Sequence, residues 1–163
     1  FAGVLTVVNK FFNIVGPTDA IVGEKDYQQL ILIQQMVTDL NMGIRIQGVP
    51  IVRVASGLAM SSRNRYLSEE EHEVALGLSA ALTAGAHASE SGADAVLAAA
   101  RSVLAAVDGL DVDYLELRRA SDLSEIGEDK AAGDTRLLIA ARVGTTRLID
   151  NAGILLEEVQ RET

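Results

Sequence analysis

The sequence predicts an α/β protein in which a βαβ unit is followed by a small α+β unit with two helices and a mostly antiparallel sheet. A continuously apolar run, Ala20-Ile21-Val22, precedes a helical pattern and then a second strand. Strand–helix–strand over this length is by default a right-handed parallel unit. Two helical stretches between residues 68 and 107 are followed by alternating segments. The expected division is therefore residues 1–52 and 53–163.

Composition narrows the class of protein. A chain of 163 residues can bury about 70% of its unfolded surface, enough for a cooperative core. The formal net charge of −9 argues against nucleic acid as a partner, because binding a phosphate backbone needs a surplus of Lys and Arg. The absence of cysteine excludes disulfides and thiolate-bound metals and fits a reducing compartment, the cytoplasm. The uncharged stretch from Val74 to Ala86 is too short to span a bilayer, so no membrane partner is expected.

The N-terminal part predicts helix, strand, helix and strand in that order. Apolar side chains recur at near-helical spacing in the opening segment: Leu5, Val8, Phe12 and Val15. Gly16-Pro17 ends this helix. A second helix runs from Tyr27 to about Leu40, and Gly43 suits the left-handed position after it. Ile44–Val49 then alternates as a strand.

The C-terminal part begins with a loop, Pro50–Leu67. Ser68 and Glu71 match a capping box, which predicts a helix to about Ser89, and Ser91-Gly92 separates it from a second helix at Ala93–Val107. The buried stripe of the first helix is predicted to be Val74, Leu78 and Leu82.

Three segments complete the predicted C-terminal unit. Val112–Leu117 alternates as a half-buried antiparallel strand does. Ser121–Asp134 is polar and predicts a loop with a helical turn. Arg136–Val143 and Thr146–Asn151 flank Gly144-Thr145, which predicts a hairpin.

Two segments carry groups that suit phosphate. Gly23 follows the first strand and Lys25 lies near the start of the next helix, where backbone N–H groups and the helix dipole favour an anion. If that helix begins near Lys25, then Lys25 and Gln29 share a face. The second segment, Met60–Arg65, holds two hydroxyls, an amide and two guanidiniums, all donors to phosphate oxygens. An ordinary turn and a polar surface loop are the alternatives.

Together, Gly23–Gln29 and Gly57–Leu67 closely resemble the pantothenate synthetase (pantoate–β-alanine ligase) family. The opening Phe1–Val8 is also similar to that family, as are Tyr114–Leu117 and Thr145–Asn151. The resemblance implies the C-terminal part of a Rossmann-like nucleotidyltransferase domain for residues 1–52. It implies a small C-terminal lid domain for residues 53–163.

The resemblance also implies roles for individual residues. The positions matching the ATP-binding stretches are Gly23, Glu24, Lys25, Asp26, Val52, Met60, Ser61, Ser62 and Arg63. Gln29 matches a pantoate-binding glutamine. The residues expected to stabilise phosphate charge during catalysis are Lys25, Ser61, Ser62 and Arg63.

The implied reaction is an ATP-dependent condensation of (R)-pantoate with β-alanine. Pantoate forms pantoyl adenylate and pyrophosphate, and the amine of β-alanine then releases AMP and pantothenate. Mg²⁺ and a homodimer are implied for the full-length enzyme. The family's His-x-Gly-His-type signature lies upstream of the matched region, and the only histidines here are His72 and His87. The chain is therefore expected to be a C-terminal portion that is inactive alone.

The sequence leaves two other functions open. A non-catalytic folded fragment would self-associate or bind nucleotide weakly. Another adenylate-forming transferase of similar architecture is disfavoured by Gln29 and by the joint occurrence of both motifs. His72 and His87 are expected on a solvated helix face, and no residue is assigned to a metal.

Overall fold

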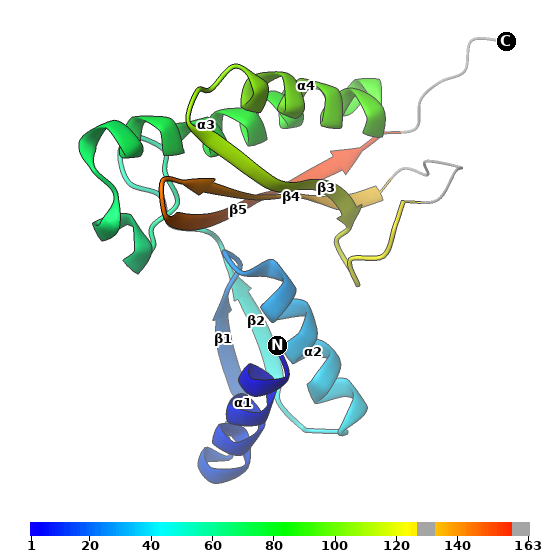
Figure 1. Cartoon of the computed structure of the whole chain (residues 1–163). Coiled ribbons are helices and arrows are strands. Elements are labelled where there is room, and N and C mark those ends of the chain that lie inside the picture. Colours follow the sequence, from blue (N-terminus) through cyan, green and yellow to red (C-terminus); the bar gives the residue numbers. More distant parts are fainter. Residues whose placement is uncertain (127–132, 158–163) are drawn as a thin grey trace, which may run out of the picture. The chain divides into compact units, whose positions relative to one another are not determined.

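The first 51 residues form two helices and a two-stranded parallel sheet, in a computed structural model that describes residues 1–126 and 133–157 (Figure 1). Helix α1 (Ala2–Val15) precedes strand β1 (Asp19–Gly23), helix α2 (Tyr27–Asp39) and strand β2 (Arg45–Val49). The two strands pair in register from Asp19 opposite Arg45 to Gly23 opposite Val49. The predicted βαβ arrangement is confirmed. Residues 1–51 are called unit 1 below, and residues 52–163 are called unit 2.

The sequence predicted the C-terminal end of α1 correctly but not that of α2. Gly16 ends α1 in the left-handed conformation (φ 61°), as Gly16-Pro17 indicated. After α2, Asn41 rather than Gly43 takes that conformation (φ 50°). The N–H of Met42 donates to the carbonyl of Val37 at 2.9 Å, a Schellman bond that places the left-handed residue at position 41. Asparagine tolerates this conformation better than most non-glycine residues.

Unit 1 buries one helix and leaves the other exposed. The buried side chains of α2 are Tyr27, Leu30, Ile33 and Val37. None of the 14 described residues of α1 is buried, and Ile14 at its end is 76% exposed. In β1, Ile21 is 70% exposed between less exposed neighbours. The continuously apolar run Ala20-Ile21-Val22 is typical of a parallel strand covered on both faces, but within the described residues only one face of β1 is covered.

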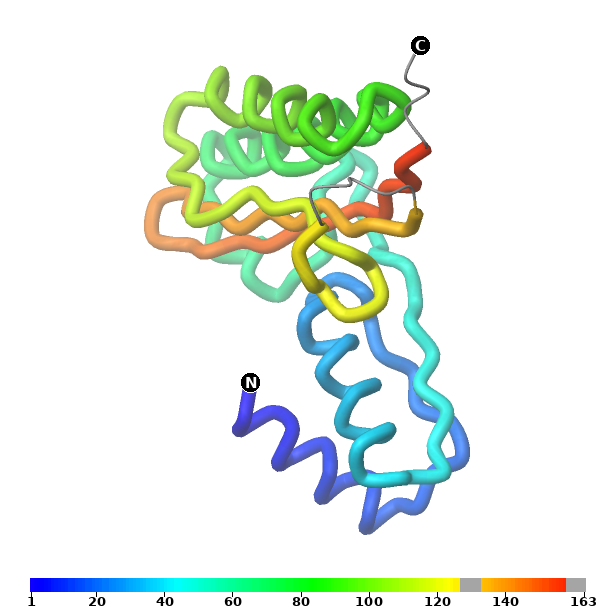
Figure 2. Tube along the Cα trace, turned by 90° about the vertical axis from the view of Figure 1, so that its right-hand side faces the viewer, coloured from blue at the N-terminus to red at the C-terminus, as the bar shows by residue number. Residues whose placement is uncertain are grey.

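Unit 2 places two helices against one face of an antiparallel sheet (Figures 1 and 2). Its elements are the 3₁₀ helices η1 (Ser62–Tyr66) and η2 (Ser89–Ser91), helices α3 (Glu69–His87) and α4 (Ala93–Ala105), and strands β3 (Leu110–Arg119), β4 (Gly133–Val143) and β5 (Thr146–Leu156). The strand order is β3-β4-β5. The architecture is as predicted, and all three strands extend beyond their predicted ends because tertiary pairing continues past the alternating pattern.

The polar stretch expected as a loop between β3 and β4 is partly described. The N–H of Leu123 donates to the carbonyl of Arg119, which forms a single helical-type turn, and Glu125 pairs with Arg118 in an isolated bridge. Residues 127–132 of the predicted loop lie outside the described residues. Gly133 and Asp134 begin β4 rather than ending the loop.

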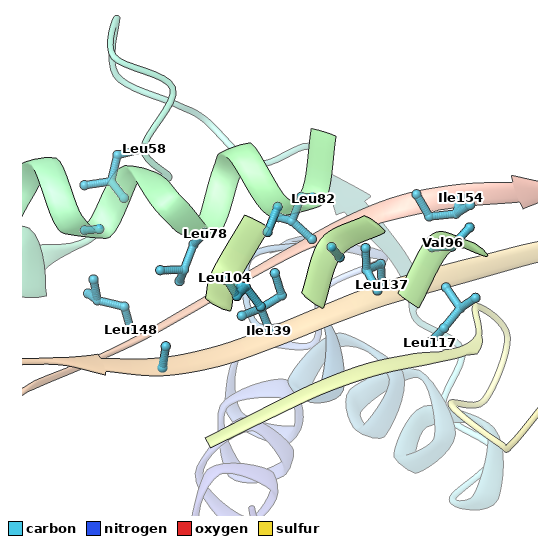
Figure 3. Close-up of a cluster of buried hydrophobic side chains, with 14 of the residues drawn as sticks. Leu58, Leu78, Leu82, Val96, Leu104, Leu117, Leu137, Ile139, Leu148 and Ile154 are labelled. Carbon is cyan, nitrogen blue, oxygen red and sulfur yellow. The ribbon is translucent and has the colours of Figure 1, made fainter. Parts of the chain in front are cut away.

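Local and long-range contacts both stabilise α3. The capping box is formed: the N–H of Ser68 donates to Glu71 at 2.9 Å, and the N–H of Glu71 donates to the Ser68 hydroxyl at 3.1 Å. Leu78 and Leu82 are buried, while Val74 is only partly buried. Figure 3 shows these leucines gathered with side chains of α4 and the sheet. A Cβ at Gly85 would lie 2.6 Å from Leu137, so glycine permits the close approach of α3 to β4.

Candidate functional site

The first candidate segment lies at the end of β1. Gly23 is the last residue of that strand, and Glu24 and Lys25 form the turn that leads to α2. The N–H of Glu24 donates to the carbonyl of Val49 at 2.9 Å, which ties the turn to the end of β2. The segment therefore lies at the carboxyl edge of the parallel pair, where ligands bind in open α/β sheets.

The helix that follows begins at Tyr27, as predicted, so the condition that it begins near Lys25 is not met. α2 starts at Tyr27, and Asp26 is its N-cap, whose carboxylate accepts from the N–H of Gln29 at 3.2 Å. Lys25 lies before the helix, so Lys25 and Gln29 do not share a helical face. The Asp26 carboxylate also offsets part of the positive end of the helix dipole. Positive charge at this turn therefore comes mainly from the partly buried Lys25 side chain.

A groove of about 360 Å³ opens beside this turn within unit 1. Gly23 and Gln29 line it together with apolar side chains of α1, β1 and α2: Val7, Val8, Phe11, Phe12, Ala20, Ile21, Val22 and Ile33. Among these residues Gln29 supplies the polar side chain, a primary amide that both donates and accepts. The groove suits a small ligand with apolar methyl groups and one or two polar groups.

The second candidate segment begins with a short hairpin, residues 52–60, where the sequence predicted only a loop. The N–H of Met60 donates to the carbonyl of Val52 at 2.8 Å, and the N–H of Val54 donates to that of Leu58 at 3.0 Å. Gly57 turns the chain with a positive φ of 94°. Val52 and Met60, both predicted to contact ATP, are thus neighbours at the base of the hairpin. The Ser56-Gly57 dipeptide was the signal for this turn.

The hydroxyl and arginine cluster follows the hairpin directly. The Ser61 hydroxyl accepts from the N–H of Arg63 at 3.2 Å and caps η1, while Ser62 and Arg63 are exposed. Asn64 donates to the carbonyl of Ala59 at 3.0 Å. The Arg65 guanidinium bonds to the Tyr66 hydroxyl at 2.6 Å and lies over its ring. Asn64 and Arg65 thus have contacts within the chain.

An ion pair that the sequence did not indicate attaches this hairpin to β5. Arg53 donates from Nη1 and Nη2 to the two carboxylate oxygens of Asp150, at 2.7 and 2.9 Å. The Asp150 side chain is 1% exposed and that of Arg53 is 31% exposed. The two residues are 97 positions apart, so no spacing rule could have paired them.

The predicted site residues fall into two groups, one in each unit. Unit 1 brings together Gly23, Glu24, Lys25, Asp26 and Gln29, and unit 2 brings together Val52, Met60, Ser61, Ser62 and Arg63. His72 and His87 lie on α3. Across residues 1–126 and 133–157, no group of three or more His, Cys, Asp or Glu side chains is arranged to hold a metal ion. Over the same residues, no helix is long and apolar enough to cross a membrane.

Comparison with known proteins identifies the family. The fold is that of an α/β protein whose βα turn lies at the carboxyl edge of a parallel sheet. A family model described as pantoate-beta-alanine ligase matches residues 1–153, and the chain therefore belongs to the pantoate–β-alanine ligase family.

Curated relatives are similar over nearly the whole chain. A pantothenate synthetase of Corynebacterium jeikeium is 66% identical over 156 residues, which are 96% of this chain and 50% of the relative. One from Nocardia farcinica is 61% identical over 96% of this chain and 48% of the relative. The chain thus spans about half the length of the curated relatives it matches.

Solved structures agree with this assignment. A crystal structure of pantothenate synthetase from Thermus thermophilus matches 92% of this chain and 54% of its own, with a TM-score of 0.86 and 41% identity. A pantoate-beta-alanine ligase from Francisella tularensis, complexed with beta-gamma ATP and beta-alanine, matches 91% of this chain and 48% of its own. Its TM-score is 0.63 and its identity 30%.

Proposed function

We propose that this chain supplies ATP- and pantoate-binding groups to an enzyme that condenses (R)-pantoate with β-alanine. The observation that carries the proposal is membership of the ligase family over residues 1–153, a range that includes both candidate segments. The Francisella tularensis relative is described as a complex with beta-gamma ATP and beta-alanine, which agrees with these substrates.

In the proposed reaction, the chain positions charge rather than forming a covalent bond. Pantoate carboxylate attacks the α-phosphorus of ATP, and pyrophosphate leaves with the electron pair of the broken P–O bond. The amine of β-alanine then attacks the acyl carbon of pantoyl adenylate and AMP departs. Lys25 at the βα turn and the donors Ser61, Ser62 and Arg63 would stabilise the phosphate charge that develops in the first step.

The groove beside Gln29 supports the assignment of this residue to pantoate. Pantoate carries two methyl groups on one carbon and hydroxyls on either side of it. An apolar lining accommodates the methyl groups, and the Gln29 amide offers hydrogen bonds to a hydroxyl or to the carboxylate. Val52 and Met60 at the hairpin base would contact the adenine end of ATP.

Magnesium belongs to the proposal as a companion of ATP. Mg²⁺ keeps several of its waters and is commonly held by substrate phosphates with one or two carboxylates. The described part of the chain offers no cluster of three or more His, Cys, Asp or Glu side chains arranged for a metal. We therefore assign no residue of this chain to the ion, and no step depends on one.

The test joins this chain to the part of the Corynebacterium jeikeium enzyme that it does not match. The fusion protein should form pantothenate and AMP from ATP, pantoate and β-alanine. It should also exchange labelled pyrophosphate into ATP only when pantoate is present, which reports the adenylate step alone. Absence of both activities in a folded fusion protein would contradict the proposal.

A non-catalytic, self-associating module is the second candidate, and the exposed face of α1 favours it. Val7, Phe11 and Ile14 recur along one side of the helix and are 59%, 64% and 76% exposed. Sedimentation of the chain at several concentrations, with and without ATP, separates the two functions. Tight association with no nucleotide response supports the module. A homodimer is part of the first proposal and is tested by sedimentation of the fusion protein.

A further inference from the structure

An ion pair attaches the hairpin of residues 52–60 to the sheet of unit 2. Arg53 binds both carboxylate oxygens of Asp150 on β5, and its Nη1 also donates to the carbonyl of Gly57 at 3.1 Å. One guanidinium therefore joins the turn of the hairpin to a strand almost one hundred residues later. A planar guanidinium bound through two parallel N–H donors fixes orientation as well as distance.

Asp150 is a carboxylate in an apolar position. On β5 it lies on the same face of the strand as Leu148 and Ile154, since side chains an even number of positions apart share a face. In the register of the sheet it lies opposite Ile139. Its Oδ1 also accepts from the N–H of Asn151 at 2.8 Å. A charge in such surroundings is retained only with a partner. Arg53 is that partner, so the sequence places a buried charge where an apolar residue would pack.

The other contacts of the hairpin anchor mainly its outgoing strand. Leu58 and Ala59 are 3% exposed and anchor the outgoing strand, and Asn64 donates to the carbonyl of Ala59. The incoming strand has the Val54 and Met60 hydrogen bonds to its partner, and Arg53 lies between those two bonds. The carbonyl of Val52 accepts from the N–H of Met60, and the residue that follows Val52, Arg53, is the one that Asp150 binds.

We propose that Arg53 and Asp150 are positioning residues for ATP. Their ion pair holds the hairpin on β5 so that Val52 and Met60, and the Ser61–Arg63 segment that follows, are presented to the nucleotide in one arrangement. This inference rests on the proposed function, since it concerns the same ATP-binding groups. Neither residue contacts ATP in the proposal, and both act through the hairpin.

A purely structural role is the competing explanation, and the choice of variant separates the two. Arg53→Met alone leaves Asp150 as a buried unpaired charge and lowers stability for that reason. The double variant Arg53→Met/Asp150→Asn removes both charges, conserves volume, and keeps an acceptor for the N–H of Asn151. Its thermal midpoint should return close to the wild-type value, because no buried charge is left unpaired.

The double variant is then measured in the fusion protein. If the pair positions the hairpin, the KM for ATP rises about tenfold and kcat/KM falls about 10- to 100-fold, although the fold is stable, because a displacement near 1 Å is enough for such a loss. Arg53→Lys keeps the positive charge but cannot donate two parallel hydrogen bonds to the carboxylate. Its KM for ATP should lie between those of the double variant and the wild type. Wild-type kinetics in the stable double variant would overturn the inference.

A second measurement uses this chain without the assay. Amide hydrogen exchange at Val54 and Met60, whose N–H groups close the hairpin ladder, should accelerate at least tenfold in the double variant. Exchange at Ile139 should stay unchanged. Val96→Ala, a core substitution on α4, is the matched control and should lower the thermal midpoint without selectively accelerating Val54 and Met60. Equal exchange of these two amides in wild type and double variant would overturn the inference.

The two proposals fail in different ways. A folded wild-type fusion protein without pantoate-dependent pyrophosphate exchange contradicts the proposed function, and the role in ATP positioning falls with it. An active wild-type fusion protein whose double variant has normal KM for ATP contradicts only the positioning role of Arg53 and Asp150.

Discussion

Helix α1 of unit 1 and helix α3 of unit 2 both have apolar residues at helical spacing, but only α3 has buried residues. α1 in unit 1 has apolar residues along its length, yet none of its 14 described residues is buried. α3 in unit 2 is less regularly apolar but buries six residues, Ala75, Gly77, Leu78, Ala81, Leu82 and Gly85. A periodic apolar pattern therefore predicts that a helix forms and which face is apolar. It does not predict whether another element covers that face.

The candidate site residues of the two units also differ in the contacts that hold them. In unit 1 they lie within one βα turn and its helix start, which the Asp26 cap and the bond from Glu24 to Val49 of the neighbouring strand hold in place. In unit 2 the hairpin that carries Val52 and Met60 is held by Asp150, 97 positions from Arg53. Substitutions at helix caps are therefore expected to act alike in both units, whereas substitutions of apolar side chains should act strongly in the buried face of α3 and weakly on the exposed face of α1.

The largest expected effect is on the core of unit 2. Leu78→Ala should lower the free energy of unfolding by about 2–5 kcal/mol, because a 1% exposed leucine leaves a cavity when truncated. Leu155→Ala, at a leucine that is 61% exposed, is the matched control and should change it by less than about 0.5 kcal/mol. Urea unfolding followed by circular dichroism measures both. Equal losses would mean that unit 2 is no better packed there than at its surface.

The next effect concerns chemistry in unit 1. Lys25→Ala in the fusion protein should slow pantoate-dependent pyrophosphate exchange about 100-fold or more, as loss of one preorganised charge donor commonly does. Lys10→Ala, at an exposed lysine of α1, should leave the exchange rate unchanged. Near-normal exchange in Lys25→Ala would make the lysine an ordinary turn charge.

A smaller and equal effect is expected at the two helix caps. Ser68→Ala removes the cap of α3 and Asp26→Ala removes that of α2, and each should cost about 1 kcal/mol because capping acts within one turn. Amide exchange in the first turns of α2 and α3 reports each helix separately. A loss of stability several times larger at one cap would show that the two units differ in their local contacts as well.

The smallest effect is expected on the exposed face of α1. Phe11→Ala should change the free energy of unfolding by no more than about 0.5 kcal/mol in this chain, because its side chain is 64% exposed. The same substitution at Phe12, a less exposed neighbour, provides the comparison, since both side chains line the groove. A loss near that of Leu78→Ala would mean that the Phe11 face is covered in solution.

Much of the fold was predictable because its signals are local. Gly16 ends α1, the Ser68–Glu71 capping box starts α3, and Gly144-Thr145 separates the paired strands β4 and β5. The start of α2 at Tyr27 was also as predicted. The prediction of Gly43 as the left-handed residue failed, because the bond from Met42 to Val37 ends the helix earlier and places Asn41 in that conformation. No local pattern indicated the pairing of Arg53 with the distant Asp150.

In the candidate site, too, some features are predictable from the sequence and others are not. The types and order of Lys25, Gln29, Ser61, Ser62 and Arg63 are readable from the sequence, since phosphate-binding chemistry depends on which donors are present. Their roles are predictions that pyrophosphate exchange in the fusion protein tests. The sequence predicts only a loop around Ser56-Gly57, so it does not predict the pairing of Val52 with Met60.

The sequence by itself determined the order of helices and strands, the end of α1 at Gly16, the capping box of α3 and the residue types offered to a phosphate, because each depends on neighbours within a few positions. Only the tertiary structure decided that Arg53 reaches Asp150, that Gly85 admits Leu137, and that one face of α1 stays exposed. Those outcomes depend on which distant surfaces meet. The free energy of burying an apolar side chain or an ion pair arises only when they do.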